Sequence, residues 1–276
     1  MFFKELYRYR HLLREIVVKN IKIQYRHSVL GVVWTLLEPL LTTLVLVFVF
    51  GRLFGGARLA QDPNIINFPI YLLCGRLLFH FFSQSTKRAM KSMKSSASVI
   101  KKVRVPKFIY PVANVLSNFV TFLISLVVLV GFVVFFVVAA SERNPAPYLT
   151  WNLLLAPVPL LILFILSVGV GLIVSTLAVF FKDVEYLYSV FTMTLFYATP
   201  IFWSPATMGG SPDRGLMMVL NINPLFAIIE MFRDTVLRGQ MIQLRQFVFA
   251  LVFALVVLVI GIWLFQRKQN EFVLHI

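Results

Sequence analysis

The chain has 276 residues, of which 59% are hydrophobic and 13% charged, whereas soluble domains average about 45–50% and 25%. This composition excludes an ordinary soluble enzyme and predicts an all-α protein that crosses a membrane several times. The net charge of +15 could indicate nucleic-acid binding, but the basic residues gather beside the apolar runs. That pattern follows the positive-inside rule and favours contact with anionic lipid head groups. We therefore expect membrane lipids, and no nucleic acid, as partners.

Residues 1–28 are expected to form an amphipathic helix on the cytosolic membrane surface. Polar side chains recur every three or four residues, which places them on one helical face: Lys4, Arg8, His11, Glu15, Lys19, Lys22 and Arg26. Such a helix lies along the interface rather than across the bilayer. Two interpretations stay open, a simple membrane anchor and a lever that contacts a partner subunit.

Six apolar segments are predicted to be transmembrane helices, together forming one domain over residues 29–267. They lie at 29–50, 68–86, 108–140, 151–181, 186–203 and 247–265. About 20 apolar residues are needed to cross a hydrocarbon core of about 30 Å. The basic segments place residues 1–28, the loop 87–107 and the tail 268–276 in the cytosol, so both termini are expected there.

Two charged residues lie inside the first two predicted spans. Glu38 precedes Pro39 in the first span, and Arg76 lies in the second. Both are about ten residues from the cytosolic end, roughly 15 Å of helical rise. Opposite charges at equal depth on consecutive antiparallel helices are expected to pair, or else to line a pathway for a polar substrate.

The loop at residues 87–107 carries eight basic residues and no acidic one. A short helix is expected from Lys91 to Val99, and Pro106 prevents it from continuing into the third span. The loop is either a solvated positive segment or the surface on which an energising subunit docks. Its charge favours a cytosolic position in both cases.

Residues 204–243 are too polar for a span, although they contain short apolar stretches. These stretches are 215–219, 224–232 and 235–237, and prolines and glycines separate them. We expect short re-entrant helices that dip into the outer leaflet and return, which requires protein or water around their ends. An ordinary external loop is the alternative.

Motifs for catalysis are missing from the sequence. It has no GxxxxGK[ST] phosphate-binding loop, and its four histidines and single cysteine have no metal-ligand spacing. We therefore expect no catalytic site, metal or cofactor in this chain. Energy for uphill transport would come from another subunit. A membrane scaffold or biosynthetic enzyme without transport is the alternative class.

Short motifs along the whole chain resemble ABC exporter permeases of the polysaccharide and polyol-phosphate export family. The run YRHSVLGVVW at 25–34, followed by Glu38-Pro39-Leu40, resembles the beginning of their first span. Further matches are RVP at 104–106, FFKDV at 180–184, TPIF at 199–202, NPL at 223–225, FR at 232–233 and LRG at 237–239. Glu38 departs from the pattern, in which an uncharged polar residue is expected before the proline.

The likeness is greatest to permeases of bacterial wall teichoic acid exporters. It implies a multi-pass protein of the plasma membrane that exports a polymer linked to undecaprenyl diphosphate. Exporters of O-antigen or capsular polysaccharide are the alternative, followed by drug or lipid exporters of the same fold. The resemblance also implies a homodimer with a conduit between its subunits, and two separate ABC nucleotide-binding subunits that hold ATP and Mg.

The resemblance also suggests three sets of functional residues. Residues of the coupling helix, about 91–103, and of the inner turn would contact the ATPase: Lys91, Lys94, Ser95, Ser98, Lys101, Lys102, Arg104, Lys182 and Asp183. A basic rim would attract the lipid head group: Arg26, Lys101, Lys102, Arg104 and Lys107. Charged residues and amphipathic aromatic rings are the conduit candidates: Glu38, Arg76, Tyr186, Tyr188, Tyr197 and Trp203.

Overall fold

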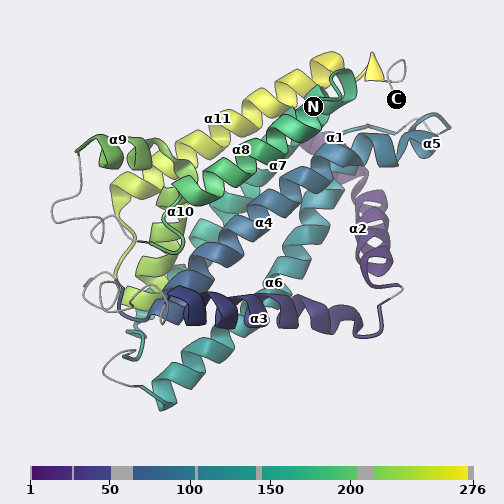
Figure 1. The fold of residues 1–276 in the computed structure, drawn as a ribbon. Coiled ribbons are helices and arrows are strands. Elements are labelled where there is room, and N and C mark those ends of the chain that lie inside the picture. The colour runs from purple at the N-terminus through teal and green to yellow at the C-terminus, as the bar shows by residue number, and fades with distance from the viewer. Residues whose placement is uncertain are drawn as a thin grey trace.

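The computed structural model describes residues 2–26, 28–50, 65–102, 105–140, 145–203 and 214–272. These residues form helices and loops, with no strand among them (Figure 1). The first half of the chain contains α1 (Phe2–Arg8), α2 (Arg10–Tyr25), a 3₁₀ turn (Gly31–Val33), α3 (Trp34–Phe48), α4 (Phe68–Ser95), α5 (Ala97–Ile100) and α6 (Ile109–Val138). The second half contains a 3₁₀ turn (Trp151–Leu155), α7 (Pro157–Phe180), α8 (Val184–Ala198), α9 (Arg214–Ile222), α10 (Pro224–Arg233), a π turn (Asp234–Arg238) and α11 (Leu244–Lys268).

Helix α4 forms the centre of the bundle. It packs against α6 on one side and α7 on another, and α7 in turn packs against α11. In Figure 1, α4, α7, α8 and α11 run in similar directions, while α3 crosses in front of the bundle and contacts α4 and α6. Most side chains of α4 are buried, including Leu72, Leu78 and Phe81. The apolar core therefore lies between α4, α6 and α7.

Four helical segments of the described chain are long and apolar enough to cross a membrane. They are Gly31–Phe48, Ile109–Val138, Trp151–Phe180 and Leu244–Lys268, and they correspond to the first, third, fourth and sixth predicted spans. The other two predicted spans do not meet these criteria. Helix α4 has 28 residues, roughly 42 Å, but its charged residues lower its apolarity. Helix α8 has only 15 residues, roughly 22 Å, because it stops before Pro200.

The N-terminal segment has the predicted amphipathic character but consists of two helices. The chain turns at Tyr9 between α1 and α2, so the prediction of one uninterrupted helix over this segment is wrong. The predicted polar stripe is exposed, at Lys4, Arg8, His11, Glu15, Lys19, Lys22 and Arg26. Phe2 and Val17 are buried, and Leu6, Leu13 and Ile16 pack against the core.

Both ends of the described chain meet at one end of the bundle, together with α5 (Figure 1). The Phe2 and Phe108 rings lie 4.5 Å apart, which joins α1 to the start of α6. The Lys107 ammonium donates to the backbone carbonyl of Gln269 beyond α11. Two termini on the same side are what an even number of membrane crossings requires.

The basic segment after α4 differs from the prediction. Helix α4 continues without a break past residue 86 and ends at Ser95, so the expected helix from Lys91 to Val99 is not a separate element. The helix is interrupted at Ser96, and α5 adds a single helical turn at Ala97–Ile100. The physical reason is that residues 87–94 contain no proline or glycine to end the helix.

Candidate functional site

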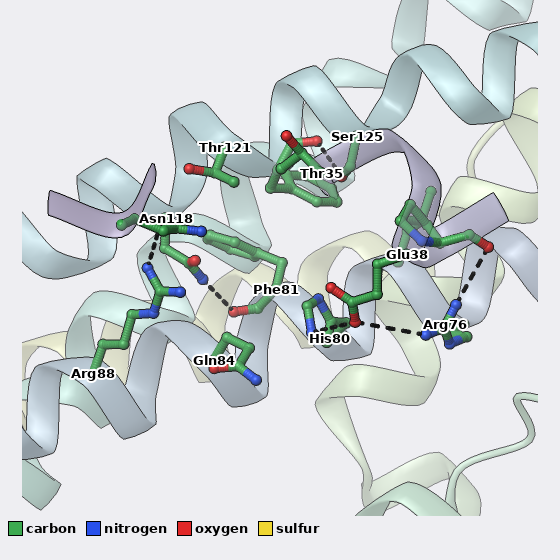
Figure 2. A pocket seen from close by; sticks show the side chains of 14 residues that line it. Thr35, Glu38, Arg76, His80, Phe81, Gln84, Arg88, Asn118, Thr121 and Ser125 are labelled. Atoms are coloured by element: carbon green, nitrogen blue, oxygen red, sulfur yellow. Dashed lines mark hydrogen bonds and ion pairs between the residues drawn. The ribbon is translucent and has the colours of Figure 1, made fainter. Parts of the chain in front are cut away.

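One face of α4 carries a ladder of polar side chains, although most of the helix is buried. Arg76, His80, Gln84 and Arg88 follow one another at intervals of four residues, which places them in a row along one helical face. All four line a cavity of about 160 Å³ (Figure 2). We call this row the α4 ladder.

Polar residues of three other helices complete the walls of this cavity. Helix α6 contributes Asn118, Thr121 and Ser125, α3 contributes Thr35 and Glu38, and α2 contributes Gln24. Figure 2 shows the side chains from α3 and α6 opposite the α4 ladder. We call the cavity and its polar walls the polar seam. Four apolar residues also line the cavity: Pro39, Leu77, Phe81 and Phe122.

A charged cluster occupies one end of the polar seam. The Glu38 Oε1 atom lies 3.9 Å from Arg76 Nη2 and 3.6 Å from His80 Nε2. Arg76 Nη1 also donates to the backbone carbonyl of Pro39 at 3.4 Å. The predicted ion pair between Glu38 and Arg76 is therefore confirmed. Its distance exceeds the 2.7–2.9 Å of a strong charge-assisted hydrogen bond, so the two groups are only loosely joined.

The other end of the polar seam reaches the N-terminal helices. Arg88 Nη1 donates to Gln24 Oε1 at 2.7 Å, which joins α4 to α2. Deeper in the seam, Asn118 Nδ2 donates to Ser85 Oγ at 2.9 Å and thereby fixes α6 against α4. The seam thus runs along α4 from the α2 contact to the Glu38 cluster, lined by polar groups at both ends.

Comparison of the chain with known proteins identifies its family. The model of the ABC-2 type transporter family matches residues 11–237. The chain belongs to the ABC-2 type transporter family. It is a multi-pass membrane protein of the bacterial plasma membrane, with several apolar helices.

Curated relatives of this ABC-2 chain cover nearly its whole length. It is 27% identical over 269 residues to the O-antigen export system permease protein RfbA of Myxococcus xanthus, covering 98% of this chain and 96% of the relative. A Klebsiella pneumoniae protein of the same name is 28% identical over 264 residues, covering 95% and 93%. The polysialic acid transport protein KpsM of Escherichia coli is 23% identical over 257 residues, covering 92% of each chain. These names match the predicted alternative rather than wall teichoic acid.

The residues expected to couple this ABC-2 permease to an ATPase lie at one end of the bundle. The following are exposed: Lys91, Lys94, Ser95, Ser98, Lys101, Lys102, Lys182 and Asp183. Arg104 lies outside the described residues. Lys94 Nζ pairs with Glu185 Oε1 at 2.6 Å, which joins the end of α4 to the first turn of α8. This contact brings the two predicted coupling segments together.

The basic-rim candidates differ in their accessibility. Arg26, Lys101 and Lys102 are exposed, and Arg104 again lies outside the described residues. Lys107 is half-buried, binds the Gln269 carbonyl and lies 5.9 Å from the Phe272 ring centre. Burial lowers the pKa of the Lys107 ammonium. Lys107 therefore anchors the C-terminal segment and is less available to a ligand than the other three.

The conduit candidates also separate into groups. Glu38 and Arg76 line the polar seam. Tyr186 and Tyr197 project from α8 as exposed side chains, and the half-buried Trp203 donates from Nε1 to the Tyr197 carbonyl at 3.3 Å. Tyr188 turns into the bundle instead, where its hydroxyl donates to Thr86 Oγ1 at 2.7 Å. It fixes α8 against α4.

Sequence reasoning missed a buried ionic cluster near α10 at the opposite end of the bundle. Arg233 is fully buried and donates to the backbone carbonyls of Tyr71 at 3.2 Å, Pro200 at 2.8 Å and Ile201 at 3.1 Å. It also pairs with Glu230 at 2.8 Å. The FR motif at 232–233 belongs to the family resemblance, which gives no role for its arginine. A basic residue inside an apolar run was the available signal.

The electrostatics of this cluster involve two further residues. Arg238 Nη1 lies 2.8 Å from Glu230 Oε2 and 2.5 Å from Asp234 Oδ1. Burial alone would raise the pKa of Glu230, but the guanidinium groups of Arg233 and Arg238 lower it overall. The Glu230 carboxylate is therefore held in its charged form. No group of three or more metal-ligating side chains occurs among the described residues.

Proposed function

We propose that this chain is the permease subunit of an ATP-driven exporter that moves a lipid-linked polysaccharide of the O-antigen or capsular type to the cell surface. The observation that carries the proposal is the match over nearly the full length to O-antigen permeases and to a polysialic acid transport protein. These relatives reverse the order of the two substrates predicted from sequence, and wall teichoic acid becomes the second. The polar seam supports a polar, charged substrate, because an apolar drug would not need such walls.

The proposed membrane topology has six spans with both termini in the cytosol. Helices α4 and α8 supply the two spans beyond the four apolar ones, and protein contacts on α4 offset the cost of its charged residues. The common position of the two chain ends supports an even number of crossings. In this orientation α5 faces the cytosol and α10 lies near the outer surface.

We further propose a homodimer with a conduit between the subunits. Helix α8 presents an exposed aromatic and aliphatic face that suits a second copy: Tyr186, Leu187, Val190, Phe191, Met193 and Tyr197. Tyrosine rings suit a conduit wall because they combine an apolar body with a polar hydroxyl. Two cytosolic ABC subunits, which would hold ATP and Mg, would dock on the exposed basic residues around α5 and on the turn at Lys182.

The test of this function begins with purification of the tagged chain in mild detergent. We expect a subunit with a Walker motif to co-purify in stoichiometric amount and to hydrolyse ATP. In the native bacterium, loss of this chain should remove the surface glycan and leave lipid-linked glycan inside the cell. Recovery of the chain alone in several detergents and in nanodiscs, with normal surface glycan in the deletion strain, would contradict the proposal.

Charge reversal beside α5 is expected to uncouple the permease from its ATPase. Lys101 and Lys102 are exposed and directly follow α5. The double variant Lys101→Glu/Lys102→Glu should reduce glycan export and ATPase recovery at least about tenfold, because like-charge contacts across an interface cost several kcal/mol. Membrane insertion should be unchanged. The matched control is Arg245→Glu, an exposed residue at the other end of the bundle, and equal losses in both variants would argue against a docking role.

A further inference from the structure

Arg76 has more hydrogen-bonding capacity than the described residues use. A guanidinium has five N–H donors, and the Arg76 side chain is only 15% exposed. Its contacts there are the Pro39 carbonyl at 3.4 Å and the Glu38 carboxylate at 3.9 Å. Groups buried to this extent are ordinarily well hydrogen-bonded. The remaining donors therefore face the polar seam, where a ligand or water can accept from them.

The α4 ladder has a second guanidinium group at the other end of the seam. Arg88 lies twelve residues from Arg76, which corresponds to about 18 Å along the helix. His80 and Gln84 continue the row between them, and Glu38 is the single acidic group among the lining residues. The cavity volume of about 160 Å³ is far larger than one water requires. Since empty cavities are apolar, a polar cavity of this size holds water or a polar ligand.

The geometry points to a binding site for an anion of the phosphate type carried on a lipid, with Glu38 as an internal counter-ion that the ligand displaces from Arg76. This inference rests on the proposed function and deepens it, because it locates the head-group site inside one subunit. Arginine is suited to phosphate because its planar fork can donate two parallel hydrogen bonds. The loose 3.9 Å contact lets Glu38 neutralise Arg76 in the absence of ligand without competing strongly when one arrives.

The position of Glu38 supports both its displacement and a lipid-borne ligand. Its side chain is 54% exposed, so the carboxylate can turn away from Arg76 into an open region. On α3 it is followed at intervals of three or four by Leu41, Val45 and Phe48, all of which are exposed. An apolar stripe that begins beside the charged cluster suits a ligand with a charged head and an apolar tail.

The contact at the other end of the seam links ligand access to α2. Arg88 is held by Gln24 at 2.7 Å, so a movement of α2 would alter the first basic group that an anion meets. Phosphate would then pass from Arg88 to Gln84, then to His80 and finally to Arg76. The ladder gives the anion successive donors about 6 Å apart, which is one helical step of four residues.

A binding experiment with four variants tests the inference on the full-length chain purified with its partner subunits. The probe is farnesyl diphosphate, with inorganic diphosphate as competitor and farnesol as the uncharged control. Arg76→Gln should weaken farnesyl diphosphate binding at least about tenfold, since charge-assisted hydrogen bonds are lost. Glu38→Gln should tighten it about tenfold, because the competing carboxylate is gone. Arg245→Gln, which changes an exposed arginine outside the seam, should have no effect.

The double variant Glu38→Gln/Arg76→Gln separates a specific from a general effect. If Glu38 acts through Arg76, the double variant binds as weakly as Arg76→Gln alone. The tighter binding of Glu38→Gln is a gain that misfolding cannot produce. Unchanged or weaker binding in Glu38→Gln, equal binding of farnesol, or failure of inorganic diphosphate to compete would overturn the inference. Because ATPase recovery and glycan export are measured separately, the site can fail while the exporter function stands.

Discussion

Replacing Arg233 with methionine is expected to destabilise the permease by several kcal/mol and to remove most of the folded protein from the membrane. Arg233 donates to the carbonyls of Tyr71, Pro200 and Ile201, which methionine would leave without that donor. A hydrogen bond from a charged donor contributes about 1.5–3 kcal/mol. The variant also removes one cationic partner of Glu230, and breaking a buried ion pair costs about 3–5 kcal/mol.

The measurement is the thermal unfolding midpoint and the monodisperse fraction of the purified variant. Arg245→Met is the matched control, since Arg245 is exposed and should change neither quantity. Arg233→Lys is expected to fall between the two, because an ammonium keeps the charge but lacks the planar fork. Equal midpoints for the Arg233 and Arg245 methionine variants would show that the buried cluster does not stabilise this end of the bundle.

Features that depend on the helical period or on depth in the membrane can be predicted from the sequence alone. The polar stripe at 1–26 follows the helical period, and its residues are exposed as expected. Glu38 and Arg76 were predicted to pair from their equal distances to the cytosolic ends, and they lie 3.9 Å apart. Helical geometry determines the exposed stripe, and the cost of charge in a membrane favours the ion pair. Neither prediction requires knowledge of the tertiary packing.

The α4 ladder could have been found from sequence but was not. Arg76, His80, Gln84 and Arg88 have the spacing of one helical face, yet the predicted span ended at residue 86 and separated Arg88 from the rest. Helix α4 in fact continues to Ser95. The charged residues after residue 86 mark the end of the apolar part of α4 but not the end of the helix. A helix boundary set by hydropathy alone therefore leaves Arg88 outside the helix and does not reveal the full α4 ladder.

Other features depend on tertiary contacts that no local pattern reveals. Tyr188 was grouped with Tyr186 and Tyr197 because all three rings are amphipathic, but its hydroxyl bonds to Thr86 on α4. Likewise, the carbonyls that Arg233 binds come from residues 71, 200 and 201, far away in the chain. The family resemblance identified the FR motif, and only the fold explains why an arginine can be buried there.

The second large effect is expected where α7 crosses α11. Gly169→Ala would place a Cβ 2.7 Å from the Leu258 backbone nitrogen and 2.8 Å from its Cα. On the other helix, a Cβ at Gly261 would lie 2.5 Å from the Gly169 carbonyl oxygen. These neighbours are backbone atoms, which cannot rotate away as a side chain can. The two helices would have to separate, as expected for a crossing that depends on small residues.

Overpacking of this kind costs about 1–3 kcal/mol, and more where the backbone must move. At about 2–4 °C per kcal/mol for a chain of this size, Gly169→Ala should lower the unfolding midpoint by roughly 5–10 °C. The matched control is Gly131→Ala in α6, where a Cβ meets no atom within 4 Å. Alanine should be neutral or stabilising there, since it favours helix by about 1 kcal/mol over glycine. Similar midpoints for the two alanine variants would mean that α7 and α11 tolerate a wider crossing, and the close contact would then not be what holds them together.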